Sequence, residues 1–314
     1  MDAWPSVSVI VAAAAAQYSL PDALRAIANQ DYPGDIEVVV AAADEPTAKA
    51  AGDEGVVVVV DNPSGGTPAG LNLAARASSG EILVRVDAHS MIPGDYIRRI
   101  VGALVDTKAD TVGGRQVPIG TTFTEKAIAA SMSSRFGAGD ARYRIGGDPG
   151  PADTVYLGAF RRAVFDRMGG YDERFLRNQD YELNHRIRDA GGVVWLEPDV
   201  AVVYRPRSSL SALAQQYFGY GKWKRFFARS HDWSLRPRQW APPILIVALA
   251  VSLIGSLWWT WLLLVPVLYV LELIGLGLAS LPRRGAPALL MPVALAVMHI
   301  SWGVGFLFGQ TRDR

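Results

Sequence analysis

EILVRVDAHSMIP, residues 81–93, is an apolar run that ends in a polar cluster. Glu81–Val86 is rich in isoleucine and valine, which is typical of a buried central strand. Asp87 and His89 follow two positions apart, so their side chains project the same way from the end of that strand. Open α/β sheets bind ligands at this carboxyl edge. The stretch predicts either a ligand site there or an ordinary capped turn made by Asp87 and Ser90.

An aspartate beside a histidine has a specific chemical use. A carboxylate and an imidazole can hold a divalent cation, and that cation can hold a diphosphate. The chain contains no cysteine, which excludes disulfides, thiolate metal sites and a cysteine nucleophile.

Apolar strands alternate with helices in the first part of the chain. Strands are predicted at Val7–Ala12, Ile36–Ala41 and Val56–Val60. Helices are predicted at Leu20–Asn29 and Thr67–Ala77, each with a proline in its first turn. This alternation predicts a parallel sheet with crossover helices.

Two later segments bear on function. Residues 137–151 are rich in glycine, and they predict a mobile loop that serves as a lid or as a plain surface excursion. Asp180 begins a helix, DYELNHRIRDAGG, where an acid suits the helix dipole and could be no more than a cap. Short strands at Val193–Leu196 and Val200–Tyr204 are expected to complete the sheet.

Composition divides the chain near Pro242. Half of all residues are hydrophobic, and the excess lies almost entirely beyond this proline. The net charge of +1 gives no indication of nucleic-acid binding. The N-terminal run has no basic region before it, so it predicts a first strand rather than a signal peptide. We therefore expect the water-soluble part to stay in the cytoplasm.

The C-terminal part predicts a membrane anchor. Residues 208–229 combine aromatic and basic side chains, which favours an interfacial helix over a core helix with snorkelling lysines. Glu272 is the single charged residue in 242–281, a length that predicts two transmembrane helices, and 286–309 predicts a third. Tryptophans 258, 259 and 261 mark a turn at the far interface, and Arg283 and Arg284 mark a cytoplasmic loop. Three spans put the residues from 311 outside, whereas the arginines at 312 and 314 favour the inside.

Three stretches, in this order, resemble the family 2 glycosyltransferases, in particular the membrane-anchored, succinoglycan-type ExoA group. They are TPAGLNLAARASSGEILVRVDAHSMIPGDYI (67–97), DTVYLGAFRRAVFDRMGGYDE (153–173) and NQDYELNHRIRDAGG (178–192). The resemblance runs from about Ser6 to Tyr204, and the trailing anchor is in keeping with it.

The resemblance implies a GT-A fold, a nucleotide-sugar donor and an inverting reaction. The Asp-x-Asp motif of the family falls on Asp87-Ala88-His89, which would bind Mg²⁺ or Mn²⁺. The acidic dyad falls on Gln179-Asp180, which makes Asp180 the catalytic base. A carboxylate can take the proton of an attacking sugar hydroxyl, and a cation can neutralise the leaving diphosphate.

The sequence departs from the family pattern in the nucleoside pocket. Polar residues usually follow the first strand, but here Ala12–Ala16 stand there. An aspartate usually ends the second strand, but here three alanines precede Asp44. We expect Asp44 to contact the donor instead. Arg161 and Arg162 are expected either to contact phosphate or acceptor or to be plain solvated arginines at the start of a helix.

Together these observations predict an α/β, GT-A (Rossmann-like) mixed-sheet domain over 1–205, amphipathic interfacial helices over 206–241, and about three transmembrane helices over 242–310. The predicted activity moves a sugar, from UDP-sugar, onto a lipid-linked (polyprenyl) acceptor at the cytoplasmic face of the inner membrane. One alternative is direct transfer to polyprenyl phosphate. Another is a non-catalytic scaffold that binds nucleotide or lipid.

Overall fold

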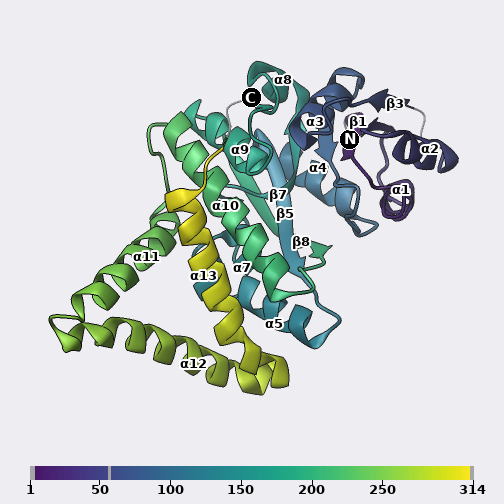
Figure 1. Ribbon diagram of the computed structural model, residues 1–314. Coiled ribbons are helices and arrows are strands. Elements are labelled where there is room, and N and C mark those ends of the chain that lie inside the picture. Colours follow the sequence, from purple (N-terminus) through teal and green to yellow (C-terminus); the bar gives the residue numbers. More distant parts are fainter. Residues whose placement is uncertain (1–3, 56–57, 312–314) are drawn as a thin grey trace. The chain divides into compact units, whose positions relative to one another are not determined.

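The computed structural model describes residues 4–55 and 58–311 and divides the chain into two compact units (Figure 1). The sheet unit comprises Met1–Val117 and Ala141–Tyr204, and the helical unit comprises Pro118–Asp140 and Arg205–Arg314. The predicted first domain was continuous to residue 205. The structure differs because the segment Pro118–Asp140 leaves the sheet and packs against the C-terminal helices.

The strands of the sheet unit form a mixed sheet that has eight strands among the described residues. Their order is β3-β2-β1-β4-β7-β5-β8-β6, with β1, β2, β3 and β4 parallel and β7 antiparallel to both β4 and β5. The bounds are β1 Val7–Ala13, β2 Ile36–Ala42, β3 Val58–Asp61, β4 Ile82–Arg85, β5 Thr111–Pro118, β6 Gly150–Pro151, β7 Tyr156–Arg161 and β8 Val194–Tyr204.

Helices connect these strands and make up most of the helical unit. In the sheet unit they are α1 Leu20–Ala28, α2 Glu45–Asp53, α3 Thr67–Arg76, α4 Tyr96–Thr107, α7 Arg142–Ile145, α8 Arg162–Arg167 and α9 Gln179–Asp189. In the helical unit they are α5 Phe123–Met132, α6 Arg135–Ala138, α10 Leu210–Ser230, α11 Pro237–Gly255, α12 Leu264–Arg284 and α13 Met291–Phe308, with 3₁₀ turns at η1 Thr260–Leu263 and η2 Ala286–Leu290.

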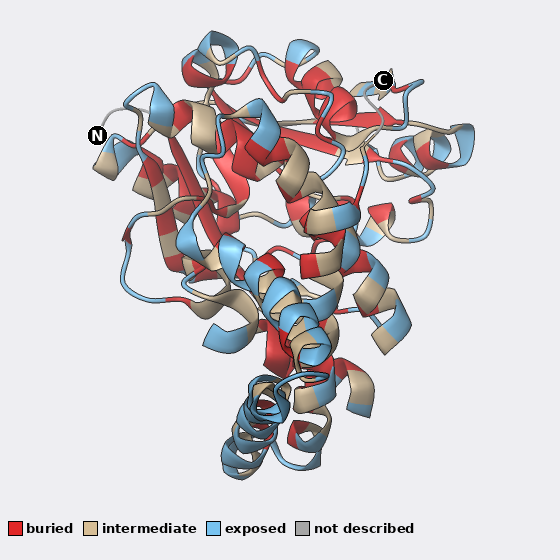
Figure 2. Ribbon diagram, turned by 60° about the vertical axis from the view of Figure 1, so that its left-hand side comes forward, coloured by how far each residue is buried: buried red, intermediate tan, exposed pale blue. Residues whose placement is uncertain are grey.

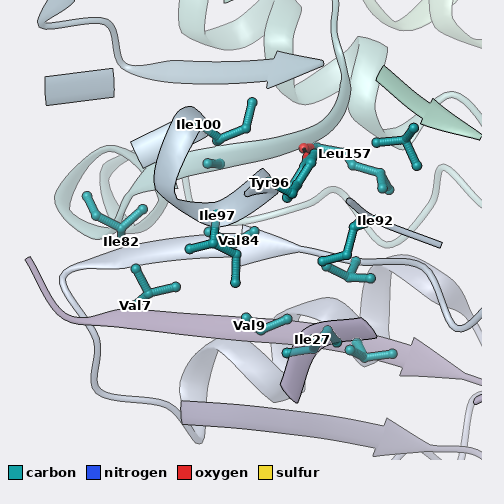
Figure 3. Close-up of a cluster of buried hydrophobic side chains, with 14 of the residues drawn as sticks. Val7, Val9, Ile27, Ile82, Val84, Ile92, Tyr96, Ile97, Ile100 and Leu157 are labelled. Atoms are coloured by element: carbon teal, nitrogen blue, oxygen red, sulfur yellow. Dashed lines mark hydrogen bonds between the residues drawn. The ribbon is translucent and has the colours of Figure 1, made fainter. Parts of the chain in front are cut away.

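The central strands are buried on both faces. Figure 2 shows the strands mainly in red, and Figure 3 shows β1 and β4 contributing Val7, Val9 and Val84 to a cluster that α4 covers. Tyr96 of α4 lies in this cluster, and its hydroxyl donates a hydrogen bond to the carbonyl oxygen of Leu157 at 2.5 Å. Each fully buried aliphatic side chain stabilises the fold by about 1.5–3 kcal/mol, so this packing holds α4 against β1 and β4.

Several predicted elements differ in detail. The glycine-rich loop at 137–151 contains the one-turn helix α7 and the short strand β6, which pairs with β8. The two short strands expected after 192 form one strand, β8. The third strand begins at Val58, and residues 56 and 57 of the prediction lie outside the described residues.

The helical unit is built on the packing of α10 against α13. A Cβ on Gly221 would collide with the carbonyl oxygen of Trp302, and one on Gly305 would collide with that of Phe218. These glycines therefore allow a close approach of the two backbones. Three described helical segments, Pro237–Gly255, Thr260–Arg284 and Ala286–Phe308, are long and apolar enough to cross a membrane.

Candidate active site

Strand β4 directs Arg85 and Asp87 to the same face of the sheet. Side chains alternate along a strand, so Ile82, Val84 and Val86 enter one core while Leu83 enters the other. Arg85 follows the direction of Leu83, and only 5% of its side chain is exposed. A guanidinium at such a position needs charged partners.

Helix α9 brings Asp180 to this face. The helix packs on the same core through Leu183 and Ile187. Asn178 precedes it with a left-handed φ of 63°, which turns the chain sharply into the first helical turn. Asp180 therefore stands in the first turn of a helix whose other side is fixed by hydrophobic contacts.

One guanidinium joins the two carboxylates. Nε and Nη2 of Arg85 contact Oδ1 of Asp87 at 2.9 and 2.8 Å, and Nη1 of Arg85 forms an ion pair with Oδ1 of Asp180. Burial acts to lower the pKa of Arg85, but the two carboxylates outweigh it and raise that pKa well above its ordinary value. One positive charge against two negative charges leaves the cluster with a net charge of −1.

The same charges act on Asp180. Burial raises the pKa of Asp180 above its ordinary value; Arg85 acts to lower it, and the neighbouring Asp87 acts to raise it further. A raised pKa makes a carboxylate a better proton acceptor, which is what a general base requires.

The aromatic ring of Tyr171 contacts the guanidinium of Arg85. The guanidinium carbon of Arg85 lies 5.9 Å from the centre of the Tyr171 ring, which is within the range of a cation–π contact. Asn72 on α3 holds the tyrosine backbone: its Nδ2 donates to the Tyr171 carbonyl oxygen at 2.8 Å, and its Oδ1 accepts from the Tyr171 N–H at 2.9 Å. Gly170 precedes it with a φ of +75°, a conformation that favours glycine.

Arg186 fastens the same loop to α9. Its guanidinium donates to the carbonyl oxygens of Met168 and Gly170 and forms an ion pair with Glu182, which is buried. The loop that carries Tyr171 and the helix that carries Asp180 are thereby tied together.

Comparison with known proteins identifies the family. Residues 5–219 match the model of the glycosyltransferase like family 2. The chain belongs to glycosyltransferase family 2. It is 33% identical, over 80% of its length and 76% of the relative, to the succinoglycan biosynthesis protein ExoA of Rhizobium meliloti. This family 2 chain is therefore a glycosyltransferase.

Solved structures agree on the GT-A fold of this family 2 enzyme. A mannosyltransferase from Pyrobaculum calidifontis, solved in complex with GDP-Man and Mn²⁺, aligns with a TM-score of 0.62 at 20% identity, over 99% of this chain and 91% of that one. The TarS fragment of S. aureus aligns with a TM-score of 0.52 at 13% identity, over 98% and 93%. At these identities the similarity shows the fold alone.

The predicted metal ligands lie at the end of β4. His89 is exposed in the turn that follows the strand. Among residues 4–55 and 58–311, no three His, Cys, Asp or Glu side chains gather as a ready-made metal site. Both contacts from Arg85 reach Oδ1 of Asp87, which leaves Oδ2 for another partner. Two protein ligands suit a cation whose remaining ligands are substrate phosphates and water.

Asp44 lies at the same edge of the sheet, after β2. Its side chain caps α2 by accepting from the Thr47 N–H at 2.9 Å, and it accepts from the Ala15 N–H at 2.7 Å. The hydrogen bonds from Ala15 and Thr47 lower the pKa of Asp44, so it is ionised at neutral pH. Asp44 therefore holds the alanine-rich loop after β1 against the start of α2.

Arg161 is not brought to this site. It pairs with Ile82 at the beginning of β4, whereas Asp87 follows the end of that strand. Its guanidinium donates to the carbonyl oxygens of Leu104 and Ala109 at 2.7 and 3.1 Å. A cavity of about 1020 Å³ at that opposite edge is also lined by Arg161, but it lies away from Asp87. The expected phosphate contact by Arg161 therefore has no support in its position, because antiparallel pairing reverses the direction of β7.

Sequence reasoning missed Arg85, Tyr171 and Asn72 as members of the site. The signal for Arg85 was present, since a charged residue inside a central apolar strand must be paired. Tyr171 and Asn72 carried no such signal, because their roles depend on contacts between distant segments of the chain.

Proposed function

We propose that this glycosyltransferase moves a sugar, with inversion, from a nucleotide sugar onto a lipid-linked acceptor at the cytoplasmic face of the membrane. The observation that carries the proposal is the joining of Asp87 and Asp180 by one buried guanidinium at the carboxyl edge of β4. Ligands of open α/β sheets bind at this edge. The relative from R. meliloti acts in succinoglycan biosynthesis, which supports a role in polysaccharide or glycolipid assembly.

Asp180 is the proposed catalytic base. The acceptor hydroxyl oxygen forms a bond to the anomeric carbon as the bond from that carbon to the diphosphate oxygen breaks. The hydroxyl proton passes to the Asp180 carboxylate, and the electron pair leaves with the nucleoside diphosphate. Attack from the side opposite the leaving group inverts the anomeric centre and needs no covalent enzyme intermediate.

Asp87 and His89 are the proposed ligands of Mg²⁺ or Mn²⁺, and Asp44 is the proposed contact to the nucleoside. A cation bound there would neutralise charge on the diphosphate. The mannosyltransferase of similar fold was solved with GDP-Man and Mn²⁺, which supports a divalent ion. The net charge of −1 on the cluster of Arg85, Asp87 and Asp180 favours a cation as well. We infer a UDP-sugar as the donor.

Calorimetry on the detergent-purified protein tests the donor site. UDP, GDP and dTDP are titrated with and without Mn²⁺, and we expect metal-dependent binding of UDP. Asp87→Asn should remove the dependence on the metal. Failure of all three nucleotides to bind would favour a scaffold that has lost the nucleoside pocket.

Measurement of kcat tests the assignment of Asp180 as the catalytic base. Asp180→Asn should reduce kcat by at least about 100-fold, the usual contribution of a general base, while nucleotide binding is retained. Asp189→Asn, an exposed acid near the other end of α9, is the matched control and should keep full activity. Full activity of Asp180→Asn would refute the assignment of Asp180 as the base.

A separate assay that compares free polyprenyl phosphate with a lipid-linked sugar identifies the acceptor.

A further inference from the structure

The end of α13, the third apolar helix of the helical unit, lies beside the start of α11, the first. Figure 1 shows α11, α12 and α13 as the sides of a triangle. The Trp240 ring, near the start of α11, lies 5.8 Å from the Phe306 ring near the end of α13. A Cβ on Gly303 would collide with the carbonyl oxygen of Pro242. The start of the first helix and the end of the third therefore lie at the same depth, which requires an even number of membrane crossings.

Helix α13 contacts α11 and α12, and it also contacts other segments of the helical unit. It packs against α10, α5 and α6. In its middle, Nε2 of His299 lies 2.8 Å from the Phe136 carbonyl oxygen. A carbonyl can only accept, so Nε2 carries the hydrogen and Nδ1 accepts from the Tyr269 hydroxyl at 3.0 Å.

The position of Phe136 in the chain gives this contact its meaning. Phe136 belongs to Pro118–Asp140, whose two ends both continue into the sheet unit. This segment carries charged side chains, including Lys126 and Arg135, and it has non-helical backbone between its helices. Exposed peptide groups cost several kcal/mol each in hydrocarbon, so the segment lies in water or at the interface. The middle of α13 lies at the same depth.

Helices α11 and α12 have the opposite character. In the most apolar 18-residue stretches of the segments containing α11 and α12, only 17% and 11% of the stretch is buried, against 39% for the segment containing α13. With 19 and 21 residues they measure about 28 and 32 Å, close to the thickness of a bilayer core. Their junction exposes aromatic and aliphatic side chains, namely Leu257, Trp258, Trp259 and Trp261. Their other ends carry arginines, namely Arg236, Arg238, Arg283 and Arg284.

We propose that α11 and α12 cross the bilayer as a hairpin and that α13 lies on the same side as α10, without crossing. The apolar surface of α11 and α12 then meets lipid tails, and the tryptophans at their junction meet the far interface. All four arginines lie on one side, as the positive-inside rule requires. Gln310 and Thr311, which follow α13, lie on that side too, whereas three crossings would put them on the other side. The inference is independent of the reaction proposed above.

Cysteine labelling tests this arrangement directly, since the natural sequence is free of cysteine. Single exposed positions mark each corner: Ser234→Cys before α11, Thr260→Cys between α11 and α12, Ala286→Cys after α12, and Gln310→Cys after α13. A membrane-impermeant maleimide is applied to vesicles of known orientation. Labelling after detergent gives the total reactive cysteine for each variant.

We expect Gln310→Cys to react from the same side as Ser234→Cys and Ala286→Cys, and Thr260→Cys to react from the other side. Reaction of Gln310→Cys together with Thr260→Cys would overturn the proposal and establish three crossings. Reaction of all four from one side would also overturn it, because no helix would then cross. Each variant must be recovered from membranes at the wild-type yield, and the cysteine-free parent measures background labelling.

Discussion

Arg85 and Asp180 form a partly buried ion pair across 95 positions of the chain, at the edge where β4 ends and α9 begins. Arg85 has a second partner in Asp87, two residues along its own strand. The guanidinium therefore fixes the distance between the proposed metal ligand and the proposed base. A planar fork can serve two carboxylates at once, which an ammonium group cannot do equally well.

Loss of Arg85 should destabilise the sheet unit. Arg85→Gln leaves Asp87 and Asp180 without their counter-charge, and breaking a buried pair costs about 3 kcal/mol at the lower end of the usual range. We take the lower end because 30% of the Asp180 side chain is exposed. Arg85→Lys keeps the charge and should lose less. Thermal unfolding in detergent measures both.

The matched control is Arg98→Gln. Arg98 pairs with Asp31 at 2.9 Å, but both side chains are largely exposed, so the loss should stay below about 1 kcal/mol. Equal losses for the Arg85 and Arg98 variants would contradict the special role of the buried guanidinium.

The acid limb of the pH–activity profile should report Asp180. A base must be ionised, and burial raises the pKa of Asp180, so kcat/KM should fall as pH drops through a value above the ordinary 3.8. Arg85→Gln removes a charge that lowers this pKa, so the limb should move to higher pH. Asp87→Asn removes a charge that raises it, so the residual activity should show a limb at lower pH.

The corresponding effect on stability has a definite sign. A carboxylate whose pKa is raised on folding favours the folded state at low pH, and this contribution is lost as pH rises through the raised pKa.

As a control for the pH–activity profile, Asp189→Asn should leave its acid limb unchanged. If the Arg85 and Asp87 variants shift the limb in the same direction, another group controls it.

Gly169 and Gly170 offer a matched pair of substitutions. Both have a φ of +75°, so alanine at either costs about 1–2 kcal/mol in backbone strain. A Cβ at Gly170 would also meet Oδ1 of Asn72 at 2.6 Å, whereas one at Gly169 would have no described atom within 4 Å. Gly170→Ala should therefore lose more stability and, through displacement of Tyr171, more of kcat. Thermal unfolding and turnover of both variants measure this difference. Identical effects at the two positions would contradict a role for Asn72 in holding Tyr171.

Gly221 and Gly275 separate helix packing from lipid exposure. A Cβ at Gly221 would collide with the backbone of α13, and one at Gly275 would meet no described atom within 4 Å. Gly221→Ala should lower the thermal unfolding temperature of the helical unit. Gly275→Ala should leave it unchanged or raise it, since alanine favours a helix over glycine by about 1 kcal/mol. A large effect at Gly275 would mean that this face of α12 is covered by another helix.

Local sequence signals account for most of the fold. Strand β4 and its polar end were predicted from the change of composition near Asp87, and α9 was predicted from its apolar stripe and terminal glycines. The resemblance to family 2 marked Asp87 and Asp180 as parts of one site, and the structure brings both to Arg85. Boundaries such as those of β8 were less accurate, because tertiary pairing extends a strand beyond its strongest local signal.

Some conclusions were not accessible from local patterns. No local pattern indicates the direction of β7, so the position of Arg161 at the edge opposite Asp87 could not be predicted. Nor could the packing of Pro118–Asp140 with the C-terminal helices be predicted, because this depends on contacts with α13.

The sequence by itself determined which segments are apolar, where helices and strands alternate, and which acids follow strands or begin helices. These properties depend on residues close together in the chain. The tertiary structure decided which charges meet and which ends of the apolar helices come together. Arg85 pairs with Asp180, and the Trp240 ring packs near the Phe306 ring, although the residues of each pair are far apart in sequence. Hydropathy identifies the apolar helices, but only their packing shows that the end of α13 lies beside the start of α11.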